Sequence, residues 1–236
     1  MTQLPDYTIF PLGDAALTID FGNSIDEAIN HKVVGLFHSL KQNFLPGIIE
    51  LVPAYSSLTV YYDVLEVKKN SPQYQTAFEA LSSQLPEKLK EPISNTIIND
   101  ELIRIPVCYD PEFALDMGEL TATKKINAEE VIRIHTAQEY TVYMLGFLPG
   151  FTYMAKVDDA ISIPRKVTPR INVEAGSVGI AGYQTGIYPL PSPGGWQIIG
   201  RTPLRLFNAG SESFTLLKPG NKVQFYSISK DEFNSY

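Results

Sequence analysis

Residues 172–203, NVEAGSVGIAGYQTGIYPLPSPGGWQIIGRTP, determine how the C-terminal part of this 236-residue chain can fold. Glycine reaches backbone conformations with positive φ and proline fixes φ, so their mixture predicts tight turns. Apolar residues such as Val178, Ile180 and Ile187 separate the turns without repeating, unlike the residues of a disordered Gly/Pro tract. The stretch therefore predicts short strands joined by shaped loops, and loops of this kind often carry a binding site.

Residues 91–236 around this stretch predict a mostly β domain. The expected strands cover residues 102–107, 141–147, 177–181, 196–199, 204–207, 214–217 and 222–226. Two helices are expected between them, one begun by Asp110 and Pro111 and running through Leu120, the other capped by Asn127 with Glu130. Many short strands with two isolated helices favour a closed or nearly closed β-barrel over a parallel α/β sheet.

Residues 1–90 predict a small α+β domain. Strands are expected over 16–21, 48–52 and 58–62. Ser24 with Glu27 predicts the start of a first helix, and Ser71 with Pro72 that of a second. Strand–helix–strand–strand–helix is the order of a split βαβ fold. The polar segment 86–99 predicts a linker, with the domain boundary near residue 90.

Composition narrows the possible partners and cofactors. The net charge of −7, with scattered Lys and Arg, argues against binding to nucleic acid or to an anionic membrane surface. Cys108 is the single cysteine, so it is expected to be a small buried residue, and with three histidines the sequence predicts no metal site. The first residues do not resemble a signal peptide and no apolar run is long enough to span a membrane, so a cytoplasmic location is expected.

His135 is the histidine with a candidate role in chemistry. It lies at the predicted end of a helix, where the helix dipole alone favours this residue type. The functional alternative makes it a general acid or base above the turn LGFLPGF, residues 145–151. That turn is interpreted either as part of a site or as a packed corner of the barrel.

Three arginines beside prolines or glycines are candidate anion binders. Arg165, Arg170 and Arg201 have neighbours that restrict the backbone, and a guanidinium held in place suits a carboxylate or a phosphate. The alternative is that they form structural salt bridges, with Glu174 and Asp158 as partners.

The same Gly/Pro segment contributes polar and aromatic candidates. Gln184 and Tyr188 are predicted to bind substrate, and Trp196 is either a wall of a ligand groove or a plug in the core. Tyr183 and Trp196 are also predicted to contact a partner protein, because Tyr and Trp dominate interface energetics. The chain contains no P-loop and no dinucleotide-binding glycine motif.

Three groups of residues together resemble one known family. They are IPVCY at 105–109, HTAQEYTVYMLGFLPGF at 135–151, and PRKVTPR at 164–170 with AGSVGIAGYQTGIYP at 175–189 and SPGGWQIIGRTP at 192–203. The chain resembles the B subunit of bacterial ATP-dependent 5-oxoprolinase, a family also called allophanate hydrolase subunit 1. This family includes the histidine-kinase inhibitor KipI and corresponds to part of the carboxyltransferase region of urea carboxylase. Asp110-Pro111 and Glu174 depart from the residues usual in the family.

The resemblance implies a cyclophilin-like β-barrel after an α+β domain, with the C and A subunits of 5-oxoprolinase as partners. It also implies ATP-dependent opening of 5-oxoproline to glutamate, with His135 as acid/base and Arg165, Arg170 and Arg201 as cations. Where ATP binds stays open. Inhibition of a sensor histidine kinase by direct binding is the alternative function.

Overall fold

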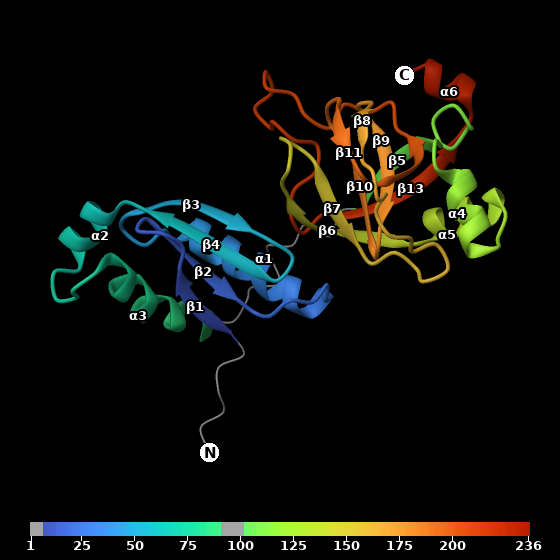
Figure 1. Cartoon of the computed structure of the whole chain (residues 1–236). Coiled ribbons are helices and arrows are strands. Elements are labelled where there is room, and N and C mark those ends of the chain that lie inside the picture. Colours follow the sequence, from blue (N-terminus) through green and yellow to red (C-terminus); the bar gives the residue numbers. More distant parts are fainter. Residues whose placement is uncertain (1–6, 91–101) are drawn as a thin grey trace. The chain divides into compact units, whose positions relative to one another are not determined.

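The structure is a computed structural model that describes residues 7–90 and 102–236 (Figure 1). It divides into two compact units, residues 1–99 and 100–236. The predicted boundary near residue 90 adjoins residues 91–101, which lie outside the described residues, and it stays a prediction. Helix α3 (Ala77–Lys90) continues through Pro86, so residues 86–90 of the expected linker are helical.

The first unit is an antiparallel sheet packed against helices. Its elements are β1 (Thr8–Pro11), β2 (Ala16–Asp20), α1 (Glu27–Gln42), β3 (Ile48–Pro53), β4 (Ser57–Tyr62), α2 (Val64–Asn70) and α3. The sheet order is β1-β2-β4-β3, so β2 and β3 both run antiparallel to β4, which lies between them. Because α1 joins β2 to β3, the predicted split βαβ arrangement is confirmed. Its core includes Leu17, Leu40, Leu58 and Leu81.

The helix starts of this unit differ from those expected. Helix α1 is capped by Asp26, which accepts a hydrogen bond from the Ile29 N–H at 2.9 Å, so the capping box expected from Ser24 is wrong. The second expected helix begins at α3, where Thr76 and Glu79 cap each other's backbone N–H groups, beyond Pro72. Strand β1 and helix α2 had no clear signal in the sequence.

The second unit contains the barrel. Its elements are β5 (Leu102–Cys108), α4 (Met117–Lys124), α5 (Ala128–Ala137), β6 (Glu139–Leu145), β7 (Thr152–Ala155), β8 (Arg170–Val173), β9 (Ser177–Ala181), β10 (Gln184–Ile187), β11 (Ser192–Gly194), β12 (Gln197–Arg201), β13 (Lys222–Ile228) and α6 (Lys230–Asn234).

Seven strands close in the order β10-β7-β6-β13-β5-β12-β9, with β9 paired to β10. The predicted fold class, an α+β domain followed by a barrel, is therefore confirmed. All neighbours are antiparallel except β13 and β5, which pair in parallel from Lys222 with Leu102 to Ile228 with Cys108. Residues inside the barrel include Ile105, Tyr140 and Phe225, all buried.

Some expected elements of this unit are wrong. Residues 110–116 form turns, and α4 begins only after Asp116, which makes no side-chain cap of its helix. Residues 204–207 and 214–217 form no strand and share only the bridge between Phe207 and Thr215. The cap of α5 is confirmed, because Asn127 accepts a hydrogen bond from the Glu130 N–H at 2.8 Å.

Candidate functional site

A pocket of about 650 Å³ on the second unit brings together four of the residues singled out in the sequence. These are Arg165, Gln184, Tyr188 and Trp196. The other lining residues are Phe147, Phe151, Tyr153, Pro164, Pro169, Ala181, Gly182, Pro193, Gly194 and Gly195. The Gly/Pro segment at residues 172–203 therefore also forms much of this cavity, here called the Arg165 pocket.

Aromatic rings form the packed wall of the Arg165 pocket. The buried Phe151 ring makes edge contacts with Trp196 and Tyr188, at centroid distances of 5.4 and 5.0 Å, and lies 4.8 Å from Tyr153. Trp196 is 5% exposed and belongs to this cluster rather than to the barrel interior. Both interpretations of Trp196 thus hold in part, because it is a packed residue and also a wall of the pocket.

The turn at residues 146–151 supplies one edge of the pocket. It joins β6 to β7, with Phe147 at φ 66° and 62% exposed while Phe151 is buried. Gly150 has φ +83°, and a Cβ there would lie 3.0 Å from the Phe207 Cβ. The turn is thus both a packed corner of the barrel and part of the pocket lining.

Arg165 is the exposed cation of this pocket. No hydrogen bond or ion pair joins its guanidinium to any residue in the described ranges. The guanidinium lies beside Gly195, where an added Cβ would be 3.5 Å from one of its terminal nitrogens. Burial raises the pKa of Tyr153, and the charge of Arg165 opposes that rise. The positive charge is therefore directed to the pocket and is not neutralised by a neighbouring carboxylate.

Gln184 and Tyr188 contribute polar groups to the same cavity. The half-buried Gln184 side chain makes no hydrogen bond within the described part of the chain. The buried Tyr188 hydroxyl lies against Gly194, where a Cβ would come within 2.5 Å of it. Burial raises the pKa of Tyr188, so its phenol is neutral at physiological pH. Gly194 is required here because any side chain would displace the tyrosine.

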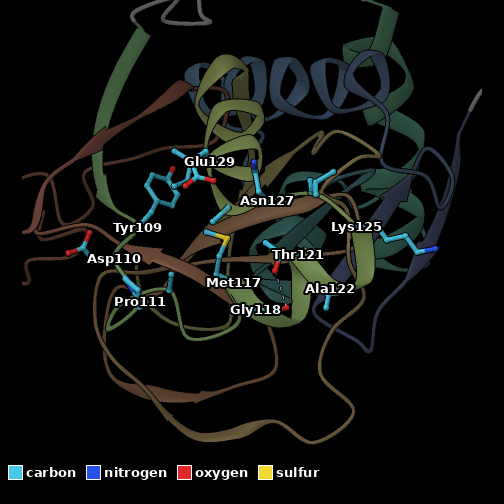
Figure 2. Close-up of a pocket in the computed structure, with 14 residues that line it drawn as sticks. Tyr109, Asp110, Pro111, Met117, Gly118, Thr121, Ala122, Lys125, Asn127 and Glu129 are labelled. Atoms are coloured by element: carbon cyan, nitrogen blue, oxygen red, sulfur yellow. Dashed lines mark hydrogen bonds between the residues drawn. The ribbon is translucent and has the colours of Figure 1, made fainter.

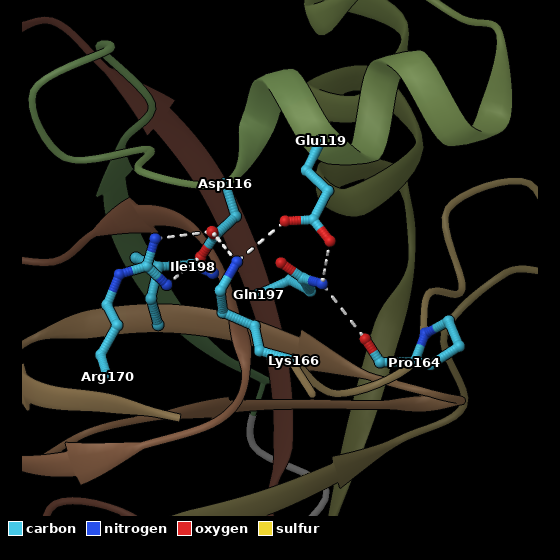
Figure 3. A network of polar contacts seen from close by, with 7 residues as sticks. All are labelled: Asp116, Glu119, Pro164, Lys166, Arg170, Gln197 and Ile198. Atoms are coloured by element: carbon cyan, nitrogen blue, oxygen red, sulfur yellow. Dashed lines mark hydrogen bonds and ion pairs between the residues drawn. The ribbon is translucent and has the colours of Figure 1, made fainter. Parts of the chain in front are cut away.

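Arg170 is bound internally and does not line the pocket (Figure 3). Its two terminal nitrogens donate to the Asp116 carboxylate at 2.6 Å each. Asp116 is 2% exposed and also accepts from Lys166 Nζ at 2.9 Å and from the Ile198 N–H at 2.7 Å. Burial alone would raise the pKa of Asp116, but these hydrogen bonds outweigh it and lower the pKa. The expected salt-bridge partners, Glu174 and Asp158, are replaced by Asp116.

This network holds the backbone on both sides of Arg165. The Lys166 N–H donates to the Gly195 carbonyl at 2.8 Å, and Gln197 Nε2 donates to the Pro164 carbonyl at 3.3 Å. Lys166 Nζ is shared between Asp116 and Glu119. Arg165 is thus an unpaired side chain on a fixed backbone, which reduces the entropy lost when a ligand binds it.

His135, in α5, packs against residues of the barrel and does not line the Arg165 pocket. It is fully buried and stacks on Phe225 at 4.5 Å. The Thr185 hydroxyl donates to the Gly179 carbonyl, so it accepts from His135 Nε2–H at 3.1 Å. Nδ1 then accepts from the Tyr109 hydroxyl at 2.8 Å. Burial lowers the pKa of His135 to about 3. A catalytic role for this neutral, doubly hydrogen-bonded ring stays a prediction that the geometry does not favour.

The lowered pKa of His135 predicts a stability that depends on pH. In the unfolded chain the group titrates near 6.5, so its contribution is complete above that pH and is lost as pH falls toward 3. We expect unfolding of the barrel to cost about 2 kcal/mol less at pH 5.0 than at pH 7.5. Thermal unfolding followed by the fluorescence of Trp196, the single tryptophan, measures this directly.

His135→Gln keeps a donor and an acceptor but does not titrate, so its melting temperature should change much less between these pH values. The matched control is His31→Gln, which removes a histidine of α1 in the other unit and should leave the wild-type dependence intact. Equal wild-type melting temperatures at both pH values would contradict the assignment.

The remaining predicted residues lie elsewhere. Arg201 lines a separate pocket of about 380 Å³, donates through Nε to the Ala175 carbonyl at 2.8 Å and lies 6.0 Å from the centre of the Phe113 ring. Tyr183 is 43% exposed, next to Lys156. The three arginines therefore do not form one anion-binding surface. Substrate binding by Arg170 and Arg201, and partner binding by Tyr183 and Trp196, stay predictions.

A larger pocket, of about 920 Å³, lies beside α4 and α5 (Figure 2). It includes Tyr109 and Met117, and of its three charged residues Lys125 and Glu129 are exposed while Asp110 is half-buried. In Figure 2 the Lys125 side chain extends away from the other labelled groups. None of the predicted site residues lines this pocket, so the Arg165 pocket is the stronger candidate.

Within the described ranges, no group of three or more His, Cys, Asp or Glu side chains could hold a metal ion. No helix among the described residues is both long and apolar enough to cross a membrane.

Comparison with known proteins identifies the family. The model of the carboxyltransferase domain, subdomain C and D, matches residues 7–217. The chain belongs to this family. It is 45% identical over 231 residues to the 5-oxoprolinase B subunit of Bacillus subtilis (strain 168), covering 98% of this chain and 96% of that protein. Identity to the 5-oxoprolinase B subunit of Escherichia coli O157:H7 is 33% over 217 residues, covering 91% and 93%.

A solved structure of similar fold is that of the protein TTHA0988. Its crystal structure has a TM-score of 0.77 and 33% identity, covering 91% of this chain. This chain spans 40% of that longer protein. The match therefore supports the fold of both units while leaving the rest of the longer chain without a counterpart here.

In this member of the carboxyltransferase family, sequence reasoning missed several residues around the pocket. Tyr153 lies in β7, and the only signal in the sequence near this short strand is the Leu148-Pro149-Gly150 turn that precedes it. Asp116 has no signal in the sequence that pairs it with Arg170, because the two residues are 54 positions apart. Only the fold brings such distant residues together.

Proposed function

We propose that this chain is the B subunit of a 5-oxoprolinase and acts with partner subunits in the ATP-dependent opening of 5-oxo-L-proline to L-glutamate. The observation that carries the proposal is the 45% identity, over nearly the full length of both proteins, to a protein of that name. The relatives match along both units, so the enzyme role is preferred to that of a histidine-kinase inhibitor.

The chemistry explains why several subunits and ATP would be needed. An unstrained lactam is a poor electrophile, and transfer of the γ-phosphoryl group to its amide oxygen makes the ring carbon open to attack. Addition of water and cleavage of the ring C–N bond give γ-glutamyl phosphate, and a second water releases phosphate and glutamate. Such steps need cations beside the developing negative charge and groups that transfer protons.

This chain fits the binding of the lactam better than the binding of ATP. The Arg165 pocket has one unpaired guanidinium and an aromatic wall, whereas a triphosphate needs several donors around its phosphates. The sequence also lacks the P-loop and dinucleotide-binding glycine motifs. We therefore place the ATP site in a partner subunit or at an interface with one.

We expect the purified chain alone to show no ATP-dependent release of glutamate from 5-oxoproline. Addition of the A and C subunits should restore turnover, measured as glutamate and phosphate formed together. Omission of ATP from the full mixture is the control for contaminating lactamases. Full turnover by this chain alone would contradict the subunit role, and an inactive mixture of three folded, assembled subunits would contradict the proposed reaction.

A further inference from the structure

The Arg165 pocket carries a charge that no neighbour satisfies. None of its lining residues is acidic, and the Arg165 guanidinium makes no hydrogen bond or ion pair to the described residues. The tyrosines beside it, Tyr153 and Tyr188, have raised pKa values because of burial and do not supply a negative charge. A small anion, above all a carboxylate that accepts two parallel hydrogen bonds from a guanidinium, is the ligand that such a pocket suits.

Gln184 adds a second, different recognition element. A primary carboxamide presents an acceptor and a donor side by side, and a ring lactam presents N–H and C=O on one edge because its amide is cis. The two edges can therefore pair through two hydrogen bonds. The backbone of Gln184 is paired to Ala155 on one side and Ala181 on the other, so its position is fixed by the barrel.

The wall of the pocket fits the rest of such a ligand. The methylenes of a five-membered ring are apolar, and the buried faces of Trp196 and Phe151 with the half-buried Tyr153 offer an apolar surface of matching character. Proline lacks the ring carbonyl and carries a cationic ring nitrogen, whereas 2-pyrrolidone lacks the carboxylate. Each of these compounds should lose one of the two recognition elements.

We propose that the Arg165 pocket binds the substrate of the proposed reaction, with the carboxylate of 5-oxo-L-proline on Arg165 and its lactam edge on Gln184. The identity of the ligand rests on the proposed function, while its chemical class, a small cyclic amide with a carboxylate, follows from the pocket. The network around Asp116 serves as positioning machinery, because it fixes the backbone at Pro164 and Lys166.

The single tryptophan of the chain lines this pocket, so its fluorescence reports on occupancy. We expect a saturable change when the full chain is titrated with 5-oxo-L-proline. Binding of 2-pyrrolidone and of L-proline should be at least tenfold weaker. Arg165→Met and Gln184→Leu should each weaken binding of 5-oxo-L-proline at least tenfold. Arg104→Met, which removes an exposed arginine of β5 outside the pocket, is the matched control and should bind like the wild type.

Two results would overturn the proposal. One is the absence of saturable binding by the folded wild-type chain both in fluorescence and in ligand-observed NMR. The other is unchanged affinity in Arg165→Met. Kinetics of the assembled complex test the substrate-binding role of the Arg165 pocket separately from the proposed reaction. An active complex whose KM for 5-oxoproline is the same with Arg165→Met rejects the pocket and keeps the reaction. Binding without turnover in the complete complex keeps the pocket and rejects the reaction.

Discussion

Asp116→Ala is expected to lower the free energy of unfolding of the barrel by about 3 kcal/mol, near the lower limit for breaking a buried ion pair. The carboxylate is 2% exposed, and its loss leaves the Ile198 N–H without its side-chain acceptor and Arg170 without its counter-charge, while Lys166 keeps Glu119 as a partner. The lower limit applies because Lys166 and Arg170 are 21% and 25% exposed and can turn partly to solvent. Chemical denaturation followed by Trp196 fluorescence measures the change.

The matched control for Asp116 is Glu119→Ala. Glu119 also binds Lys166 and accepts from Gln197, but half of its side chain is exposed. Its removal should leave the unfolding transition nearly unchanged. If Asp116→Ala unfolded at the same denaturant concentration as the wild type, the network would be a surface feature and its positioning role for Arg165 would be wrong.

Trp196→Ala is expected to cost about 3–5 kcal/mol of stability, the range for removing a large aromatic residue from a packed site. The ring is 5% exposed and makes edge contacts with Phe151 and Tyr153 at 5.4 and 5.7 Å. Its removal opens a cavity that two remaining rings cannot fill. Thermal unfolding followed by circular dichroism is the measurement, because the variant has no tryptophan left.

Tyr183→Ala is the comparison that separates packing from partner binding. Tyr183 is 43% exposed, so its removal should change stability little. Co-purification with the C subunit is then measured for both variants at a temperature where both are folded. If Tyr183→Ala lost the complex and Trp196→Ala kept it, the contact with the C subunit would lie at the exposed turn between β9 and β10 that carries Tyr183. A Trp196→Ala chain that melts like the wild type would show that the ring is not part of the packed core.

The fold could be predicted from the sequence where local signals were strong. Strand β9 was expected at the residues where it occurs, because Gly176 and Gly182 bracket an apolar run. The four-residue strands β7, β8 and β10 were missed or merged with loops, since so few residues show no clear alternation. Residues 204–207 have an apolar pattern like a strand, but Leu206 is buried by packing and not by pairing in the sheet.

The candidate site was predictable in its residue types but not in its partners. Arg165, Gln184, Tyr188 and Trp196 line one pocket, although the sequence had grouped Arg165 with Arg170 and Arg201, and their role in binding stays a prediction. The sequence could not distinguish Arg165 from Arg170, since both follow a proline. What separates them is Asp116, which reaches one arginine and not the other, and this depends on the tertiary fold alone.

The parallel pairing of β5 with β13 has a consequence for how the barrel forms during synthesis. These strands are the first and last of the barrel, and they pair side by side over seven positions. Until β13 emerges from the ribosome, β5 and β6 each present an open edge that another chain could pair with. Closure is thus a late, long-range event, and ribosome-bound fragments that end before residue 222 should need a chaperone to stay soluble.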